Sequence, residues 1–104
     1  MVLLRSCWET WIMNKYQIVQ TGKFKKDLKA VIKRGYNIEL LGVVVDALAE
    51  GKELPAKYKD HTLMGNYKGC RECHITPDWL LIYEVDGDEL YLYLTRTGSH
   101  SDLF

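Results

Sequence analysis

Three histidines are the side chains of this sequence best suited to proton transfer near neutral pH. They are His61, His74 and His100. The unperturbed pKa of an imidazole lies near about 6.5, so the group can take up or release a proton under physiological conditions. Asp78 adds a carboxylate and Arg96 a permanent positive charge. The question is whether the fold brings these five side chains together.

The stretch GCRECH at positions 69–74 offers a competing interpretation. It contains C-x-x-C-H, the pattern that attaches a c-type haem, and its cysteines have redox or zinc spacing. The segment is typical of a β-strand, in which successive side chains point to opposite faces. Cys70, Glu72 and His74 would then share one face and Cys73 would lie on the other. Two thiols that point apart cannot clasp one haem or form a disulfide, and no second Cys or His pair completes a zinc site. We therefore expect no haem, no metal and no other cofactor.

The bulk composition indicates one small globular domain. The chain has 104 residues, of which 47% are hydrophobic and 27% charged, and its formal net charge is zero. Its basic residues concentrate in positions 1–36, which permits an anionic partner. Three cysteines without a secretory signal favour the reducing cytoplasm, and no apolar run is long enough for a membrane span. We interpret residues 1–12 as an extension ahead of a single domain over residues 13–104.

Hydrophobic periodicity predicts the order strand, helix, helix, strand, strand, strand. The predicted strands are Lys15–Gln20, Asn66–Ile75, Trp79–Val85 and Leu90–Arg96, and the predicted helices follow the N-caps Thr21 and Asn37 and end near Gly35 and Gly51. Residues 51–65 and 97–104 are predicted to be irregular. We expect an α+β fold in which a helical hairpin packs on one face of a mainly antiparallel sheet.

Hairpin connections would bring the polar side chains to one edge of that sheet. The turn at Asp78 places His74 beside Trp79, and the next hairpin returns Arg96 to the same end. His61 and His100 could reach this edge from the irregular segments. Imidazoles, a carboxylate and cations suit metal-independent RNA cleavage, in which the 2′-OH is the nucleophile and side chains act as general base and general acid.

Each of these residues also has a structural interpretation. Asp78 could serve only to shape its turn, and Arg96 could pair with an acid. Trp79 could be a core residue, whereas with Tyr67 or Phe104 it could instead stack an unpaired base.

Several stretches together carry a family resemblance. They are YKDHTLMG at 58–65, Gly69 and Arg71 with His74, PDWLLIY at 77–83, RTGSH at 96–100, and Leu103-Phe104. From about residue 15 to 104 the chain resembles the RelE/ParE superfamily of bacterial toxins, and within it the YafQ-type mRNA interferases. This resemblance implies a RelE-like fold, cleavage of mRNA in the A site of the translating ribosome, and inhibition by a cognate antitoxin.

The resemblance also implies a set of functional residues. The implied active-site residues are His61, His74, Asp78, His100 and Phe104, and the implied RNA or phosphate contacts are Arg96, Trp79, Lys57 and Lys59. His100 would be the general acid, and either Asp78 or His74 the general base. His61 and Arg96 would stabilise the phosphate. Arg71 is left out because strand alternation places it opposite His74.

A second interpretation keeps the fold and changes the activity. The chain would then be a non-nuclease, ParE-like toxin that binds DNA gyrase. A pure binder has no need of three histidines and an aspartate around one sheet edge, so the sequence favours the nuclease.

Overall fold

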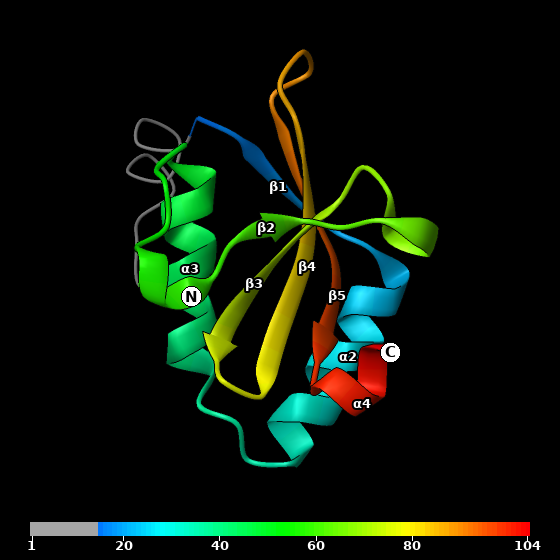
Figure 1. Cartoon of the computed structure of the whole chain (residues 1–104). Helices are drawn as coiled ribbons and strands as arrows, with labels where there is room; N and C mark the ends of the chain where they lie inside the picture. Colours follow the sequence, from blue (N-terminus) through cyan, green and yellow to red (C-terminus); the bar gives the residue numbers. More distant parts are fainter. Residues whose placement is uncertain (1–14) are drawn as a thin grey trace.

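The computed structural model describes residues 15–104, which form a five-stranded sheet with two long helices packed on one face (Figure 1). The elements are β1 (Gln17–Gln20), α2 (Gly22–Lys33), α3 (Ile38–Ala49), β2 (His61–Thr62), β3 (Arg71–Thr76), β4 (Trp79–Asp86), β5 (Tyr91–Gly98) and α4 (His100–Leu103), with 3₁₀ turns at Ala56–Tyr58 and Gly65–Tyr67. The predicted α+β class is confirmed.

Both predicted helix starts are capped as the sequence indicated. The Thr21 hydroxyl accepts a hydrogen bond from the backbone N–H of Phe24 at 3.1 Å, and the side-chain Oδ1 of Asn37 accepts one from the N–H of Glu39 at 3.1 Å. Such caps satisfy N–H groups that the first helical turn leaves without partners. Between the helices Gly35 has φ of +82°, a left-handed conformation that favours glycine.

The strand order across the sheet is β1-β5-β4-β3-β2. Strand β1 runs parallel to β5, and the other neighbours are antiparallel, so the mainly antiparallel prediction is confirmed. β1 covers only the first half of β5. Beyond it the edge is covered by side chains, since the Thr21 hydroxyl donates to the Thr95 carbonyl at 2.9 Å and the Asp27 carboxylate accepts from the Thr97 N–H at 3.2 Å. These bonds satisfy backbone groups that an open edge would leave bare.

The sheet buries residues on both faces. On the helix face, which α2 and α3 cover, the strands contribute Cys73, Ile75, Trp79, Leu81, Tyr83, Leu92 and Leu94 to the main core. On the opposite face, which we call the open face, a smaller cluster contains Cys70, Leu80, Ile82 and Leu103. Cys70 and Cys73 therefore belong to different clusters, and the prediction that the two thiols lie on opposite faces is confirmed. Cys70 and Cys73 are both free thiols.

Three boundaries differ from the sequence prediction. The strand predicted from Asn66 begins only at Arg71, because Gly65–Tyr67 closes a 3₁₀ turn. The region predicted as an irregular loop contains the two-residue strand β2, which pairs with β3. The predicted tail contains α4, whose cap residue Ser99 makes a capping box with Asp102. The interpretation of residues 1–12 lies outside the described residues, and within 15–104 no helix has the length and apolar character to cross a membrane.

The thiol of Cys73 should resist alkylation in the folded protein. Burial raises the pKa of Cys73 to about 12, and burial also raises the pKa of Cys70. Because the thiolate is the reactive form, only about 10⁻⁴ of Cys73 would be reactive at pH 8, and reactivity would increase only as the pH approaches 12. In a Cys7→Ser variant, iodoacetamide at pH 8 followed by peptide mass spectrometry should show Cys73 unmodified until guanidinium is added. Equal rates with and without guanidinium would contradict the buried placement.

Candidate functional site

The register of the sheet arranges the open-face residues in two rows. The pairs His61↔Glu72, Glu72↔Ile82 and Ile82↔Arg96 make a first row across β2, β3, β4 and β5. Directly paired residues share a face, so all four side chains start from the open face.

The second row runs parallel to the first. It consists of the pairs His74↔Leu80 and Leu80↔Gly98, after which Ser99 and His100 continue the chain. With strands about 4.8 Å apart, the Cα atoms of His74 and Gly98 are separated by about 10 Å. The apolar floor between them, made by Leu80 and its neighbour Ile82, is buried under Leu103 of α4. The sheet therefore brings histidines from β2, β3 and α4 to one end of one face.

Glu72 lies between two of these histidines. Its Oε1 is 3.4 Å from His61 Nε2 and 3.8 Å from His74 Nε2, and the two rings are 6.3 Å apart. The residue is only 5% exposed, and its Oε2 is buried without a hydrogen-bond partner among the described residues. A buried polar atom without a partner costs free energy, so its presence points to a role beyond packing.

The backbone before His61 fixes the orientation of its ring. His61 Nδ1 donates to the Lys59 carbonyl at 2.7 Å, because a carbonyl oxygen can only accept. Lys59 has φ of +50°, uncommon for a residue with a side chain. Asp60 anchors the segment from the helix face by accepting from the Tyr83 hydroxyl at 2.6 Å and from Arg71 Nη2 at 3.2 Å. The Nε2 atom of His61 is thereby directed to Glu72.

Arg71 lies on the helix face, as strand alternation predicted. Its ion pair with Asp60 raises the pKa of the guanidinium, and Tyr83, whose hydroxyl pKa is raised by burial, lies beside it. This network supports the loop that carries His61 and does not itself reach the open face.

A chain of aromatic contacts connects α4 to the rest of the site. The His100 and Phe104 ring centroids are 5.3 Å apart, and Phe104 meets Tyr67 edge to face at 5.8 Å. The Tyr67 hydroxyl accepts from Arg96 Nη1 at 3.3 Å. Phe104 is 57% exposed and His100 is also exposed, so both can contact a ligand laid on this face. Edge-to-face pairing orders such rings without burying them fully.

Arg96 is held by an acid on α2. Its Nε and Nη2 donate to the two carboxylate oxygens of Asp27 at 2.6 and 3.1 Å, and this bonding raises the pKa of the guanidinium. A guanidinium has five N–H donors, and the bonds to Asp27 and Tyr67 use three. The remaining two are available to a phosphate oxygen.

The other predicted polar residues are accessible. Asp78 is exposed in the turn between β3 and β4, beside the end of the second row, and within residues 15–104 its carboxylate has no ion pair. Lys57 and Lys59 are exposed on the segment before β2, and the Lys57 amine lies 5.1 Å from the Tyr58 ring centroid.

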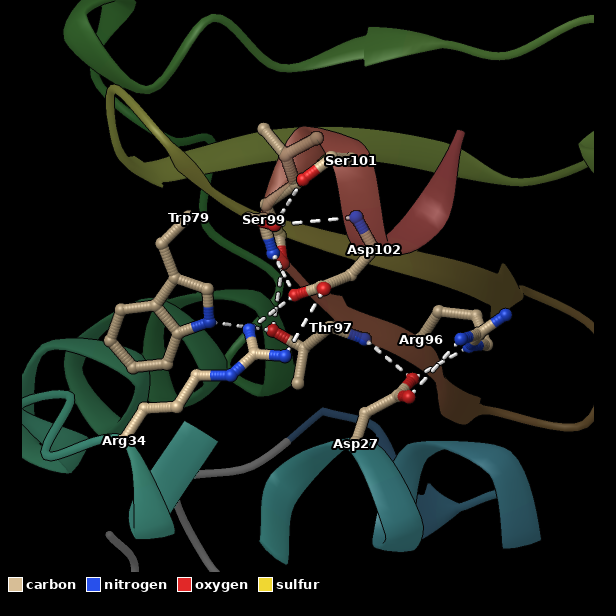
Figure 2. Close-up of polar contacts among 9 residues, drawn as sticks. Asp27, Arg34, Trp79, Arg96, Thr97, Ser99, Ser101 and Asp102 are labelled. Atoms are coloured by element: carbon tan, nitrogen blue, oxygen red, sulfur yellow. Dashed lines mark hydrogen bonds and ion pairs between the residues drawn. The ribbon is translucent and has the colours of Figure 1, made fainter. Parts of the chain in front are cut away.

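The prediction that Trp79 contacts RNA or phosphate is wrong in this structure. Trp79 is 2% exposed and belongs to the helix-face core, where it packs edge to face on Tyr36 at 5.0 Å. Its indole N–H donates to the Thr97 hydroxyl at 2.8 Å, as Figure 2 shows. The physical reason is parity, since Trp79 alternates in phase with Leu81 and Tyr83. Trp79 can therefore influence the site only through packing on the helix face of the sheet.

Two further observations help to define the site, one on metal binding and one on the position of a cavity. Among residues 15–104 no group of three or more His, Cys, Asp or Glu side chains is arranged to hold a metal ion. A cavity of about 670 Å³ lies by the end of α3, lined among others by Lys52, Asp60 and Arg71, and none of the histidines lines it. The histidines instead occupy an accessible face, which suits a long polymer better than a small molecule enclosed in a pocket.

Sequence reasoning missed two residues of this site. Glu72 shares a face with His74 in the predicted strand, and its acidic character on a buried strand was the available signal. Tyr67 was assigned only a possible stacking role, because its contact with Arg96 joins residues 29 positions apart and depends on the 3₁₀ turn that replaced the predicted strand.

Comparison with known proteins agrees with this architecture. The family model described as "Bacterial toxin of type II toxin-antitoxin system, YafQ" matches residues 16–104. The chain is 41% identical over 93 residues to the mRNA interferase toxin YafQ of Escherichia coli K12, covering 88% of this chain and 99% of that protein. It is 39% identical over 85 residues to the putative toxin YafQ of Haemophilus influenzae, covering 76% and 82% respectively.

Solved structures show the same fold. YafQ from E. coli BL21(DE3) superposes with a TM-score of 0.80 at 38% identity, covering 86% of this chain and 98% of that one. The metal-bound toxin from Helicobacter pylori gives a TM-score of 0.80 at 48% identity, with 86% and 99% coverage. The toxin of the E. coli DinJ-YafQ toxin-antitoxin complex gives a TM-score of 0.79 at 38% identity, with 86% and 98% coverage. With its fold, its length and its sequence all matched, the chain belongs to the YafQ family of toxins from type II toxin–antitoxin systems.

Proposed function

We propose that this protein is an endoribonuclease that cleaves mRNA by metal-independent acid–base catalysis on the open face of its sheet. The observation that carries the proposal is the convergence of three histidines, Asp78 and Arg96 at one end of that face, arranged by the two rows of the register. The relatives named mRNA interferase toxin support the same activity.

The reaction divides proton transfer between the two ends of the site. A general base removes the proton of the RNA 2′-OH, the 2′-oxygen attacks the adjacent phosphorus, and the 5′-oxygen leaves as an alcohol with a 2′,3′-cyclic phosphate remaining. His100 is the proposed general acid that protonates the 5′-oxygen, because it is exposed beside Phe104 and can face a leaving group. Asp78 and His74 both remain candidates for the base. One acid or base of this kind contributes about 10²–10⁴-fold.

Residues of the first row would stabilise the negative charge on the phosphorane. Arg96 offers its two remaining N–H donors, and His61 lies at the other end of that row. Lys57 and Lys59 would bind the backbone of the RNA beyond the scissile phosphate, where charge neutralisation gives affinity without sequence preference. Phe104, exposed and ordered by Tyr67, would stack a base.

Glu72 would act through its histidine neighbours. Its Oε1 lies within 3.8 Å of both His61 and His74 Nε2, close enough to orient both rings while the carboxylate itself stays buried. Since Glu72 does not reach the substrate side, we assign it a positioning role.

The relatives support one part of the proposed cellular setting, the antitoxin partner. A partner antitoxin is proposed because the E. coli relative forms the DinJ-YafQ complex. We further propose that the target is mRNA in the A site of a translating ribosome, which places the activity in the cytoplasm. A ParE-like gyrase poison remains the alternative activity on this fold.

Removal of the proposed acid or base should slow cleavage strongly without unfolding the protein. His100→Ala should lower the cleavage rate by about 10²–10⁴-fold, and Asp78→Asn by a similar factor if Asp78 is the base. The control is Asp88→Asn, a matched exposed turn aspartate at the β4–β5 hairpin, which should cleave as the wild type does. The measurement is mapping of mRNA 5′ ends after brief induction. Growth arrest that persists in the His61, His74 and His100 triple-alanine variant would favour the gyrase alternative.

Loss of the buried charge should disorder the histidine pair. Glu72→Gln keeps the side-chain shape and should lower cleavage by about 10- to 100-fold, because misplaced catalytic groups lose rate steeply. Glu84→Gln is the matched control, a half-buried glutamate on β4 away from the histidines. Unchanged cleavage in Glu72→Gln, with the imidazole NMR signals of His61 and His74 also unchanged, would remove Glu72 from the site.

Ribosome dependence can be separated from cleavage itself. A reporter mRNA should be cut when it is translated, and the same mRNA without its start codon should stay intact. Equal cutting of both mRNAs would show that the enzyme cleaves free RNA, and would leave the assignment of catalytic residues standing.

A further inference from the structure

The residues proposed as acid and stacking platform stand on the shortest helix of the fold. α4 comprises only His100–Leu103, and Phe104 follows it. A helix this short has no independent stability, because nucleation costs more than so few backbone bonds return. Leu103 packs into the open-face cluster and Phe104 meets Tyr67 edge to face, and both contacts hold the C-terminal end of the segment. The N-terminal end, where His100 lies, depends on other contacts.

Asp102 is the residue on which those contacts converge (Figure 2). Its Oδ2 accepts from Arg34 Nη1 at 2.5 Å and from the Ser99 N–H at 2.9 Å, while its Oδ1 accepts from Arg34 Nη2 at 3.1 Å. Its own N–H donates to the Ser99 hydroxyl at 3.3 Å, completing the capping box. One carboxylate thus ties the start of α4 to a two-pronged guanidinium.

Arg34 reaches α4 from a fixed position. It is the C-cap of α2, with its backbone N–H donating to the Ala30 carbonyl at 3.0 Å, so its Cα is held by the last helical turn. Asp27 lies seven residues earlier, two turns along the same helix, and binds Arg96 and the N–H of Thr97. Figure 2 shows both contacts extending from α2 toward the same stretch of chain. α2 therefore binds the end of β5 through Asp27 and the start of α4 through Arg34.

The close approach of Asp102 is built into the backbone at Gly98. Gly98 has φ of +155°, and a Cβ at this position would lie 3.0 Å from Asp102 Oδ2 and 3.1 Å from Asp102 Cβ. A side chain at this position would push the Asp102 carboxylate aside by a few tenths of an ångström, which glycine avoids. The junction between β5 and α4 is therefore closed around Asp102.

We propose that Arg34 and Asp102 form a clamp between α2 and α4 that positions His100 and Phe104 for RNA cleavage. Both are positioning residues, since neither touches the reacting groups. The inference rests on the proposed function for its catalytic part, whereas the ordering of α4 by the clamp is a property of the fold alone.

A surface ion pair is strong enough to order α4 because the stability of this short helix is marginal. Exposed ion pairs stabilise proteins only weakly, and salt screens them. For a segment whose ordered and disordered forms are close in free energy, a weak contact still changes the populations several-fold. Arg34 and the Ser99 N–H hold the pKa of Asp102 well below its usual range, so the carboxylate stays charged throughout the physiological pH range. Salt, rather than pH, should therefore loosen the clamp.

The test is a double-mutant cycle in the full-length protein with Arg34→Gln, Asp102→Asn and the pair. Amide exchange of residues 102–104, followed by NMR, should accelerate about 2- to 5-fold in each single variant, and no further in the double variant. On ribosome-bound mRNA, kcat should fall by a similar factor because His100 is the proposed acid, and any rise in KM should come from Phe104, which is proposed to stack a base. Arg34→Lys, which keeps the positive charge but cannot form the two-pronged contact, should restore part of the slow exchange and part of kcat. In the wild type, added salt should accelerate the exchange; in Asp102→Asn it should not.

Lys33→Gln is the matched control, an exposed cation one residue away without an ion pair among the described residues. It should leave exchange and kcat unchanged, and circular dichroism should show equal melting of the sheet in all variants. Additive effects of the two single variants, or faster exchange with normal kcat, would overturn the clamp as a positioning device. Failure of the proposed function would appear differently, as full cleavage by His100→Ala, and the exchange data would still decide whether Arg34 and Asp102 order α4.

Discussion

The structure depends on the burial of β4 from both sides. Residues 79–83 are all buried, although the two long helices cover only one face of the sheet. Trp79, Leu81 and Tyr83 face those helices, and Leu80 and Ile82 require a second cover. Leu103 supplies part of that cover, and the segment that brings it there also brings His100 and Phe104. The position of the proposed catalytic helix is thus a consequence of core packing on the open face, because apolar burial is what places it there.

The polar groups of the site lie around this apolar floor rather than within a cavity. His61 and Arg96 are at opposite ends of one row with Ile82 between them, so no direct contact among catalytic groups is required in the free protein. Each group is instead fixed by hydrogen bonds outside the substrate-facing side, Arg96 by those to Asp27 and the His61 loop by those to Asp60. Preorganisation of this kind lets an extended substrate bring the groups together, which is consistent with catalysis by positioned charge.

Local sequence rules predicted much of this fold, and they failed where distant contacts decide. The caps at Thr21 and Asn37 and the separation of the two thiols depend on neighbouring residues, and they were predicted correctly. α4 was missed although Ser99-x-x-Asp102 is a capping-box spacing, because four residues give no periodicity. The partnership of Arg96 with an acid 69 positions away had no local signal. Trp79 was misplaced because its functional interpretation was preferred over strand parity.

The parallel pairing of β1 with β5 has a consequence for biosynthesis. The first strand of the sheet, Gln17–Gln20, finds its partner only in Tyr91–Leu94, some 74 positions later. A nascent chain therefore carries β1 unpaired until β5 has been synthesised, and closing so long a loop delays this step of folding. His100 and Phe104 follow β5, so the proposed general acid and the stacking residue are added after every strand has been made. An incomplete chain that stops before them has all five strands but lacks the proposed general acid and the stacking residue.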